Sequence, residues 1–174
     1  ATSAPISGYG EGAGTQDAAL WWGIYVPSGN TNCTLEYSGN AWSVGGNMII
    51  TRRDSSGGGS QNAAFTAGGY SNSFQSATEE YGASWQSGPN TNDCHTNGSG
   101  ILGTSTAGIV GGGRTPTQTT CTEEFNGISW FSQNPFNTLR SQIAGFGDTN
   151  AAVFAGGHLA PNTNLKATEE WNGI

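Results

Sequence analysis

Apolar residues occur along this chain in short runs, and Gly, Ser, Thr and Asn separate each run from the next. Runs of this length between turn-forming residues are typical of short β-strands. No longer stretch places its apolar residues at the three- and four-residue spacing of an amphipathic helix. The pattern therefore predicts an all-β protein.

Two sequence words recur at a nearly constant period. One contains Thr, Glu and an aromatic residue, and its copies begin 44, 44 and 46 residues apart, at Thr34, Thr78, Thr122 and Thr168. The other leads into a glycine pair, and its copies begin 45, 44 and 44 residues apart, at Gly14, Gly59, Gly103 and Gly147. Two independent words with one period indicate four copies of a single structural unit.

The third unit shows the expected strands most clearly. We predict strands over 100–102, 107–111 and 120–125, a tight turn at Asn126–Gly127, and a fourth strand that begins at 129–130. Four antiparallel strands in about 44 residues form a β-propeller blade, which must stack on its neighbours to bury both faces. We therefore expect one propeller domain over residues 1–174, with blades at about 1–46, 47–90, 91–134 and 135–174.

The second and third units each carry a glycine pair after an apolar strand, then an acidic–aromatic pair, and then a Trp about five residues later. These positions are Gly68–Gly69, Glu80–Tyr81 and Trp85 in the second unit, and Gly112–Gly113, Glu124–Phe125 and Trp130 in the third. This arrangement resembles the kelch motif. The wording of the units is also similar to kelch-like repeats in virion and tail-fibre proteins of marine phages, notably cyanophages.

The resemblance implies a kelch-like β-propeller, and kelch propellers usually have six or seven blades. Four units correspond to a fragment, to a small closed propeller, or to part of a ring shared between chains. The first unit departs from the motif because it has Trp22-Gly23-Ile24 where a small residue and two glycines are expected. The last unit reaches Ile174 where Ser-Trp should follow, so we expect a longer polypeptide or completion of this blade by another segment.

The repeated glutamates could form a row of ligand-binding carboxylates, or they could be part of the scaffold. We favour scaffold, with the carboxylates accepting hydrogen bonds from backbone N–H groups, because Arg and Lys are too few to pair with all of them. The aromatic residues at 37, 81, 125 and 171 are expected to pack between blades. The residues assigned to the scaffold are Glu36, Glu80, Glu124, Glu170, Gly68, Gly69, Gly112, Gly113, Gly156, Gly157, Trp42, Trp85 and Trp130.

The candidate ligand-binding residues are those that differ between units. The position after each glycine pair holds a side chain that can form hydrogen bonds, and the loop behind it also varies; the four residues are Tyr25, Tyr70, Arg114 and His158. Variable loops on constant strands are typical of a binding surface on a rigid scaffold, although loops free to drift would look the same. Trp21 and Trp22 are further candidates, because adjacent residues of a strand point to opposite faces and one ring could be exposed.

Charge and candidate chemistry narrow the function. The net charge is −7 with 10% charged residues, which argues against nucleic acid or anionic membranes as partners. No nucleophile, phosphate-binding or zinc-protease motif is present, and Asp93–His95 has no second ligand pair at metal spacing. Three cysteines, Cys33, Cys94 and Cys121, make a poor disulfide framework. We therefore predict no catalytic residues, no metal and no cofactor.

The sequence as a whole favours a non-enzymatic structural and binding module. With the phage resemblance, it favours a virion appendage such as a tail fibre or receptor-binding protein, located in the virion or outside the cell. Its expected partners are other copies of itself, other virion proteins or a cell-surface glycan. A secreted bacterial lectin or adhesin is the main alternative, and a carbohydrate-active enzyme is a weaker one.

Overall fold

The computed structural model describes residues 8–93, 95–97 and 100–173, and this part of the chain consists of strands and loops without a helix. It accordingly contains no helix that is long and apolar enough to span a membrane. Cys94, part of the Asp93–His95 stretch considered above, lies outside the described residues. The predicted all-β class is confirmed.

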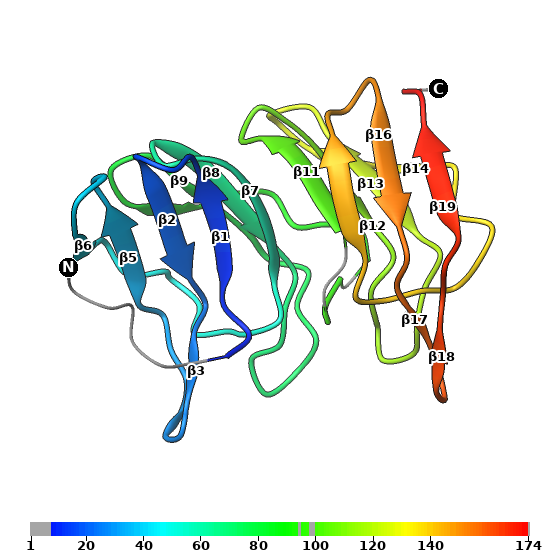
Figure 1. Ribbon diagram of the computed structural model, residues 1–174, viewed down its shortest axis with the longest axis horizontal. Coiled ribbons are helices and arrows are strands. Elements are labelled where there is room, and N and C mark those ends of the chain that lie inside the picture. The colour runs from blue at the N-terminus through cyan, green and yellow to red at the C-terminus, as the bar shows by residue number, and fades with distance from the viewer. Residues whose placement is uncertain (1–7, 94, 98–99, 174) are drawn as a thin grey trace.

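Four antiparallel sheets form the four blades of a β-propeller (Figure 1). Blade 1 contains β1 (Glu11–Gly14), β2 (Ala19–Trp22), β5 (Thr34–Tyr37) and β6 (Trp42–Val44). Blade 2 contains β7 (Ser56–Ser60), β8 (Ala63–Ala67), β9 (Thr78–Tyr81) and β10 (Trp85–Ser87). Blade 3 contains β11 (Gly100–Thr104), β12 (Ala107–Gly111), β13 (Thr122–Phe125) and β14 (Trp130–Gln133). Blade 4 contains β15 (Ala144–Gly147), β16 (Ala152–Ala155) and β19 (Thr168–Trp171).

Two short hairpins follow the second strands of the end blades. They are β3 (Tyr25–Val26) with β4 (Gly29–Asn30), and β17 (His158–Leu159) with β18 (Thr163–Asn164). Both extend from the same end of the propeller, the lower end in Figure 1. In the third unit, the four predicted strands are confirmed as β11 to β14, with small shifts of their ends.

The turn in the third unit is longer than the expected tight turn, because Phe125 pairs directly with Trp130 and leaves four residues between the strands. The Asn126 side-chain oxygen accepts hydrogen bonds from the N–H groups of Ile128 and Ser129, both at 3.0 Å. An asparagine side chain that bonds the backbone two residues on forms its own turn. The Asn-Gly signal therefore marks the correct place but a different turn.

The first repeated glycine is required by the bend between the first two strands of each blade. Gly59 has φ +102°, and a Cβ atom there would lie 2.2 Å from the carbonyl oxygen of Ala63. Gly14, Gly103 and Gly147 also have positive φ and approach a backbone oxygen as closely. Only glycine adopts this conformation without strain, which explains why this residue recurs in every unit.

The blades stack through three apolar clusters, one between each successive pair. Leu20 and Trp22 of blade 1 pack against Ala64, Tyr81 and Trp85 of blade 2. The other clusters join blade 2 to blade 3 and blade 3 to blade 4, with Phe65 and Val110 in one and Ile109 and Phe154 in the other. Alternate residues of β8 and β12 thus face opposite neighbours: Phe65 and Ile109 face the next blade, and Ala64 and Val110 face the previous one.

The first strands of the blades are innermost, with contacts from β1 to β7, from β7 to β11 and from β11 to β15. Blades 1 and 4 stand at opposite ends of the long axis in Figure 1. Phe146 and Val153 on the outer face of blade 4 correspond to Leu102 and Ile109 of blade 3, which are buried against the next blade. Phe146 is instead 63% exposed, so this face of blade 4 has no blade stacked on it among the described residues.

Candidate binding surface at the loop end

The glycine pairs hold the loops at one end of the propeller close together. Gly68 and Gly69 have φ +70° and +94°, and a Cβ atom at Gly68 would lie 1.7 Å from the carbonyl oxygen of His95 in the next inter-blade loop. The Gly69 N–H donates to that same oxygen at 2.7 Å. Because two backbones touch here, only glycine fits, and the following residue emerges at the rim.

The four candidate rim residues occupy equivalent positions. Tyr25 pairs with Gly8, Tyr70 with Arg53 and His158 with Ser141 in isolated bridges, and the Arg114 N–H donates to Thr96 at 3.0 Å. The structure brings Tyr25, Tyr70 and Arg114 to two adjoining cavities of about 320 and 220 Å³. His158 belongs to β17 in blade 4 and is not among the residues that line these two cavities.

Arg53 divides the two cavities. Its guanidinium lies 5.0 Å from the Tyr25 ring centre and 5.1 Å from the Tyr70 ring centre, within the range of cation–π attraction. Its Nη1 donates to Asn30 and its Nε to Asp54, each at 3.2 Å. The guanidinium is therefore held between two rings by a side-chain amide and a carboxylate.

Aromatic side chains form the outer walls of both cavities. Tyr9, 64% exposed, meets the Tyr25 ring edge-on at 6.0 Å in the larger cavity. Phe74 meets the Tyr70 ring edge-on at 5.7 Å in the smaller one. Rings beside amide and guanidinium groups offer both apolar contact and hydrogen bonds, a combination usual in small-ligand pockets.

Four residues in the left-handed backbone conformation surround the centre of this end. They have φ values from +53° to +64° and belong to four different blades or inter-blade loops: Tyr9, Asp54, Asn97 and Gln142. Their backbones form a chain of hydrogen bonds, from Asp54 to Tyr9 at 3.4 Å, from Asn97 to Asp54 at 3.1 Å and from Gln142 to Asn97 at 3.0 Å. Non-glycine residues rarely adopt this conformation, and Asn and Asp are the least strained in it.

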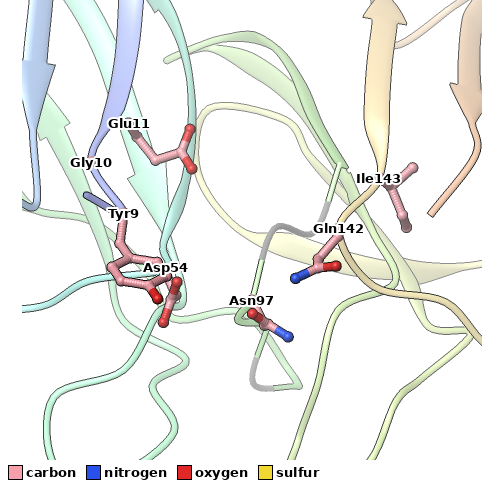
Figure 2. A pocket seen from close by; sticks show the side chains of 7 residues that line it. All are labelled: Tyr9, Gly10, Glu11, Asp54, Asn97, Gln142 and Ile143. Carbon is pink, nitrogen blue, oxygen red and sulfur yellow. The ribbon is translucent and has the colours of Figure 1, made fainter. Parts of the chain in front are cut away.

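A third cavity of about 250 Å³ lies between these residues, with Glu11 and Ile143 in its walls (Figure 2). Burial of the Glu11 carboxyl raises its pKa to about 7, and the negative charge of Asp54 adds to this effect. Carboxylate and amide oxygens are ligands that hard cations accept. Within the described part of the chain, however, no three His, Cys, Asp or Glu residues are grouped to hold a metal ion.

The two adjacent tryptophans have different environments. Trp22 is 0% exposed and meets the Trp85 ring at 5.3 Å between blades 1 and 2, so protein atoms cover both of its faces. Trp22 therefore belongs to the core and not to a ligand site. Trp21 is half-buried, lies against Gly10 and meets the Trp42 ring at 6.5 Å. Trp21, Tyr37 and Trp42 form an aromatic face on blade 1, away from the loop-end cavities.

The glutamates that accept hydrogen bonds from backbone N–H groups lie one residue before the positions expected from the sequence. Glu36, Glu80 and Glu124 are half-buried and Glu170 is exposed, whereas Glu79 and Glu123, one residue earlier in the word, are each 1% exposed. Strand alternation places this earlier glutamate on the face that meets the preceding blade, where the inter-blade loop passes. In blade 1 the corresponding residue is Leu35.

Each buried glutamate accepts hydrogen bonds from both backbone and side-chain donors of that loop. Glu79 accepts from the N–H groups of Ile49 and Ile50 at 2.7 and 3.1 Å, and it pairs with Arg52. Arg52 in turn donates to the carbonyl oxygens of Gly68 and Ala77. One side chain thus connects the loop, the glycine pair and the third strand of the blade.

Blades 3 and 4 repeat this arrangement. Glu123 accepts from the N–H groups of Asn92 and Asp93 and from His95 Nε2 at 2.9 Å, while His95 Nδ1 contacts the Gly112 carbonyl oxygen. In blade 4, Glu169 pairs with Arg140. Burial alone would raise the pKa of Glu123, but the hydrogen bonds from His95 and from the backbone hold that pKa below its usual value.

Sequence reasoning missed several residues that the structure brings together. The buried side chains that donate to these glutamates, Arg52, His95 and Arg140, lie 43 and 45 residues apart, and Arg53 adjoins the first of them. The central residues Tyr9, Asp54, Asn97 and Gln142 lie 45, 43 and 45 residues apart. The regular spacing of each set was the only signal in the sequence. The residue type changes from one copy to the next in both sets, so neither set forms a repeated sequence word.

No protein-family model matches this sequence, and no curated protein matches it significantly. The four-bladed propeller therefore stands on the strand pairing and blade stacking themselves.

Proposed function

We propose that this protein is a non-enzymatic binding module whose loop end contacts a glycan or a neighbouring protein. The observation that carries the proposal is Arg53 held between the rings of Tyr25 and Tyr70, with a cavity on each side. Aromatic rings can stack on the apolar faces of a sugar, and the guanidinium and amide groups can bond its hydroxyls. Cavities of 220 to 320 Å³ suit a neutral sugar residue or a short side chain.

We further propose that the module is part of a phage virion appendage, a tail fibre or receptor-binding protein, and acts in the virion or outside the cell. This finer assignment rests on the kelch-like wording of the repeats. Other copies of the chain, other virion proteins and cell-surface glycans are its proposed partners. Gene neighbourhood separates this proposal from a secreted bacterial lectin, because tail genes would flank the first and secretion genes the second.

A glycan-binding experiment tests the proposed surface. The wild-type protein is screened on an array of neutral oligosaccharides, and Tyr70→Ala is compared with it on the best ligand by titration calorimetry. Loss of one central aromatic contact is expected to raise Kd about tenfold or more. Phe131→Ser is the matched control, because Phe131 is an exposed ring on β14, outside the cavities, and its loss should leave Kd unchanged.

Two outcomes contradict the proposal. In the first, wild-type protein binds no glycan and assembles with no virion protein. In the second, Phe131→Ser weakens glycan binding and Tyr70→Ala does not, which would place the site elsewhere. Measurable turnover of an oligosaccharide would instead favour an enzyme.

A further inference from the structure

Blade 4 differs from the other three at its outer edge. In blades 1 to 3 the third strand pairs with a fourth, and the first pairs are Tyr37 with Trp42, Tyr81 with Trp85 and Phe125 with Trp130. In each pair the ring centres are 5.1 or 5.2 Å apart. The sheet of blade 4 has the order β15-β16-β19, so β19 is an edge strand among the described residues.

The tryptophans of the fourth strands also link successive blades. Trp85 Nε1 donates to the Thr34 hydroxyl at 2.7 Å, and Trp130 Nε1 donates to the Thr78 hydroxyl at 3.1 Å. Each bond joins the fourth strand of one blade to the third strand of the blade before it. By the same rule, the Thr122 hydroxyl of blade 3 should accept from a tryptophan in the fourth strand of blade 4.

The Thr122 hydroxyl is an unsatisfied polar group. Thr122 is 1% exposed, as buried as Thr34 and Thr78, and its Oγ1 atom has no hydrogen-bond partner among the described residues. A buried hydroxyl without a partner is costly, and most such groups in native proteins are paired. The position of this group, one repeat after two equivalent hydroxyls that each accept an indole N–H, identifies the missing donor.

The residues that would begin the turn into such a strand have the conformation seen in blade 3. Asn172–Gly173 follows β19 as Asn126–Gly127 follows β13, and Gly173 has φ +76° where Gly127 has +88°. A Cβ atom at either glycine would lie close to the turn between the first two strands, at Thr149 or Thr106. Gly173 of blade 4 thus has the same conformation, and the same close approach to the first turn of its blade, as Gly127 of blade 3.

We propose that β19 is an acceptor edge for a fourth strand that begins with tryptophan and continues from the Asn172–Gly173 turn of the same polypeptide. The indole would donate to Thr122 and pack against Trp171, which borders the cluster between blades 3 and 4. This interaction surface is independent of the proposed glycan site, because none of its residues lines the loop-end cavities.

Short extensions of the chain test the proposal. The protein is prepared with the five residues Ser-Trp-Phe-Ser-Gln, copied from 129–133, attached after Ile174. The matched control carries Phe in place of Trp in that extension, and both are also made with Thr122→Val. We expect the Trp extension to raise Tm by about 4 °C or more, and the Phe extension to raise it clearly less. Thr122→Val should remove the difference between the two.

A second measurement separates tethered from free strands. The peptide Gly-Ile-Ser-Trp-Phe-Ser-Gln is added to the unextended protein, and its binding is followed by fluorescence anisotropy. Weak binding that is lost in the Phe peptide supports the acceptor edge. If the Trp and Phe extensions give equal Tm in the protein that retains Thr122, the proposed role of the indole is wrong. Stabilisation by the free peptide but not by the attached one would overturn a strand that continues from the turn.

Discussion

At the residue scale, the structure depends on a small number of buried charges in a chain with few charges. Arg52 and Glu79 lie almost completely out of water, and burial lowers the pKa of Arg52 while Glu79 partly restores it. A buried pair of this kind adds little net stability, but removal of one partner leaves an uncompensated charge. Glu80, one of the repeated glutamates considered as possible ligands, is therefore adjacent to Glu79, which holds the loop between blades 1 and 2.

Replacement of one carboxylate tests this role. Glu79→Gln should lower the free energy of unfolding by about 3–5 kcal/mol, because it leaves the Arg52 guanidinium buried without its counter-charge. The control is Glu80→Gln at the adjacent half-buried position, which should change the free energy by less than about 1 kcal/mol. Urea unfolding followed by tryptophan fluorescence measures both. Equal losses in the two variants would contradict the assignment.

At the element scale, the blades are linked through their edges. Thr34 and Thr78, buried in the third strands of blades 1 and 2, each accept a hydrogen bond from the tryptophan in the outermost strand of the following blade. The linkage belongs to the strands, because it requires the register that places Phe125 opposite Trp130 and Thr122 opposite Gln133. A one-residue shift of that pairing would move the indole to the other face of the sheet.

Two matched substitutions separate a paired threonine from an unpaired one. Thr78→Val should destabilise the protein by about 1–3 kcal/mol, because the Trp130 indole N–H is left buried without an acceptor. Thr122→Val in the unextended chain should be neutral or slightly stabilising, since this hydroxyl has no partner within the described residues. Thermal unfolding by circular dichroism compares them. A larger loss at Thr122 than at Thr78 would contradict the pattern.

At the scale of the whole molecule, the inner ends of all four blades meet around one cavity that contains an acid with a raised pKa. Glu11 belongs to blade 1, Asp54 and Asn97 to the loops before blades 2 and 3, and Gln142 to the loop before blade 4 (Figure 2). A carboxyl whose pKa is higher in the folded state is destabilising wherever it is ionised. The electrostatics of the centre therefore affect the stability of the assembled propeller.

The pH dependence follows from the sign of this shift. The Glu11 pKa rises from 4.5 to about 7, so the folded state binds the proton more tightly and stability should fall as pH rises between those values. Glu11→Gln should remove this fall, and its advantage over wild type should grow from pH 4.5 to 7.5. Urea unfolding at intervals of pH measures it. The lowered pKa of Glu123 acts in the other direction and only at lower pH, where its stabilising contribution is lost.

The fold could be predicted from local sequence, whereas the binding surface could be predicted only in part. Repeated glycines and threonines are constrained by backbone geometry that is the same in each copy, so the period identified the blades. Tyr70 and Arg114 could be predicted because they directly follow the glycine pairs, and Tyr25 because it occupies the equivalent position after Gly23-Ile24. Arg53 was not, because its role depends on two rings from blade 1 and blade 2 that meet only after the blades stack.

The direction of the threonine–tryptophan bonds has a consequence for a chain that is made from its N-terminus. Thr34 is in the first repeat and its partner Trp85 is at the end of the second, 51 residues later. When the first repeat leaves the ribosome, the Thr34 hydroxyl has no indole donor until the whole second repeat has been synthesised and has emerged. Each blade is thus finished one repeat late, and the nascent propeller always ends in a blade whose threonine still lacks its indole.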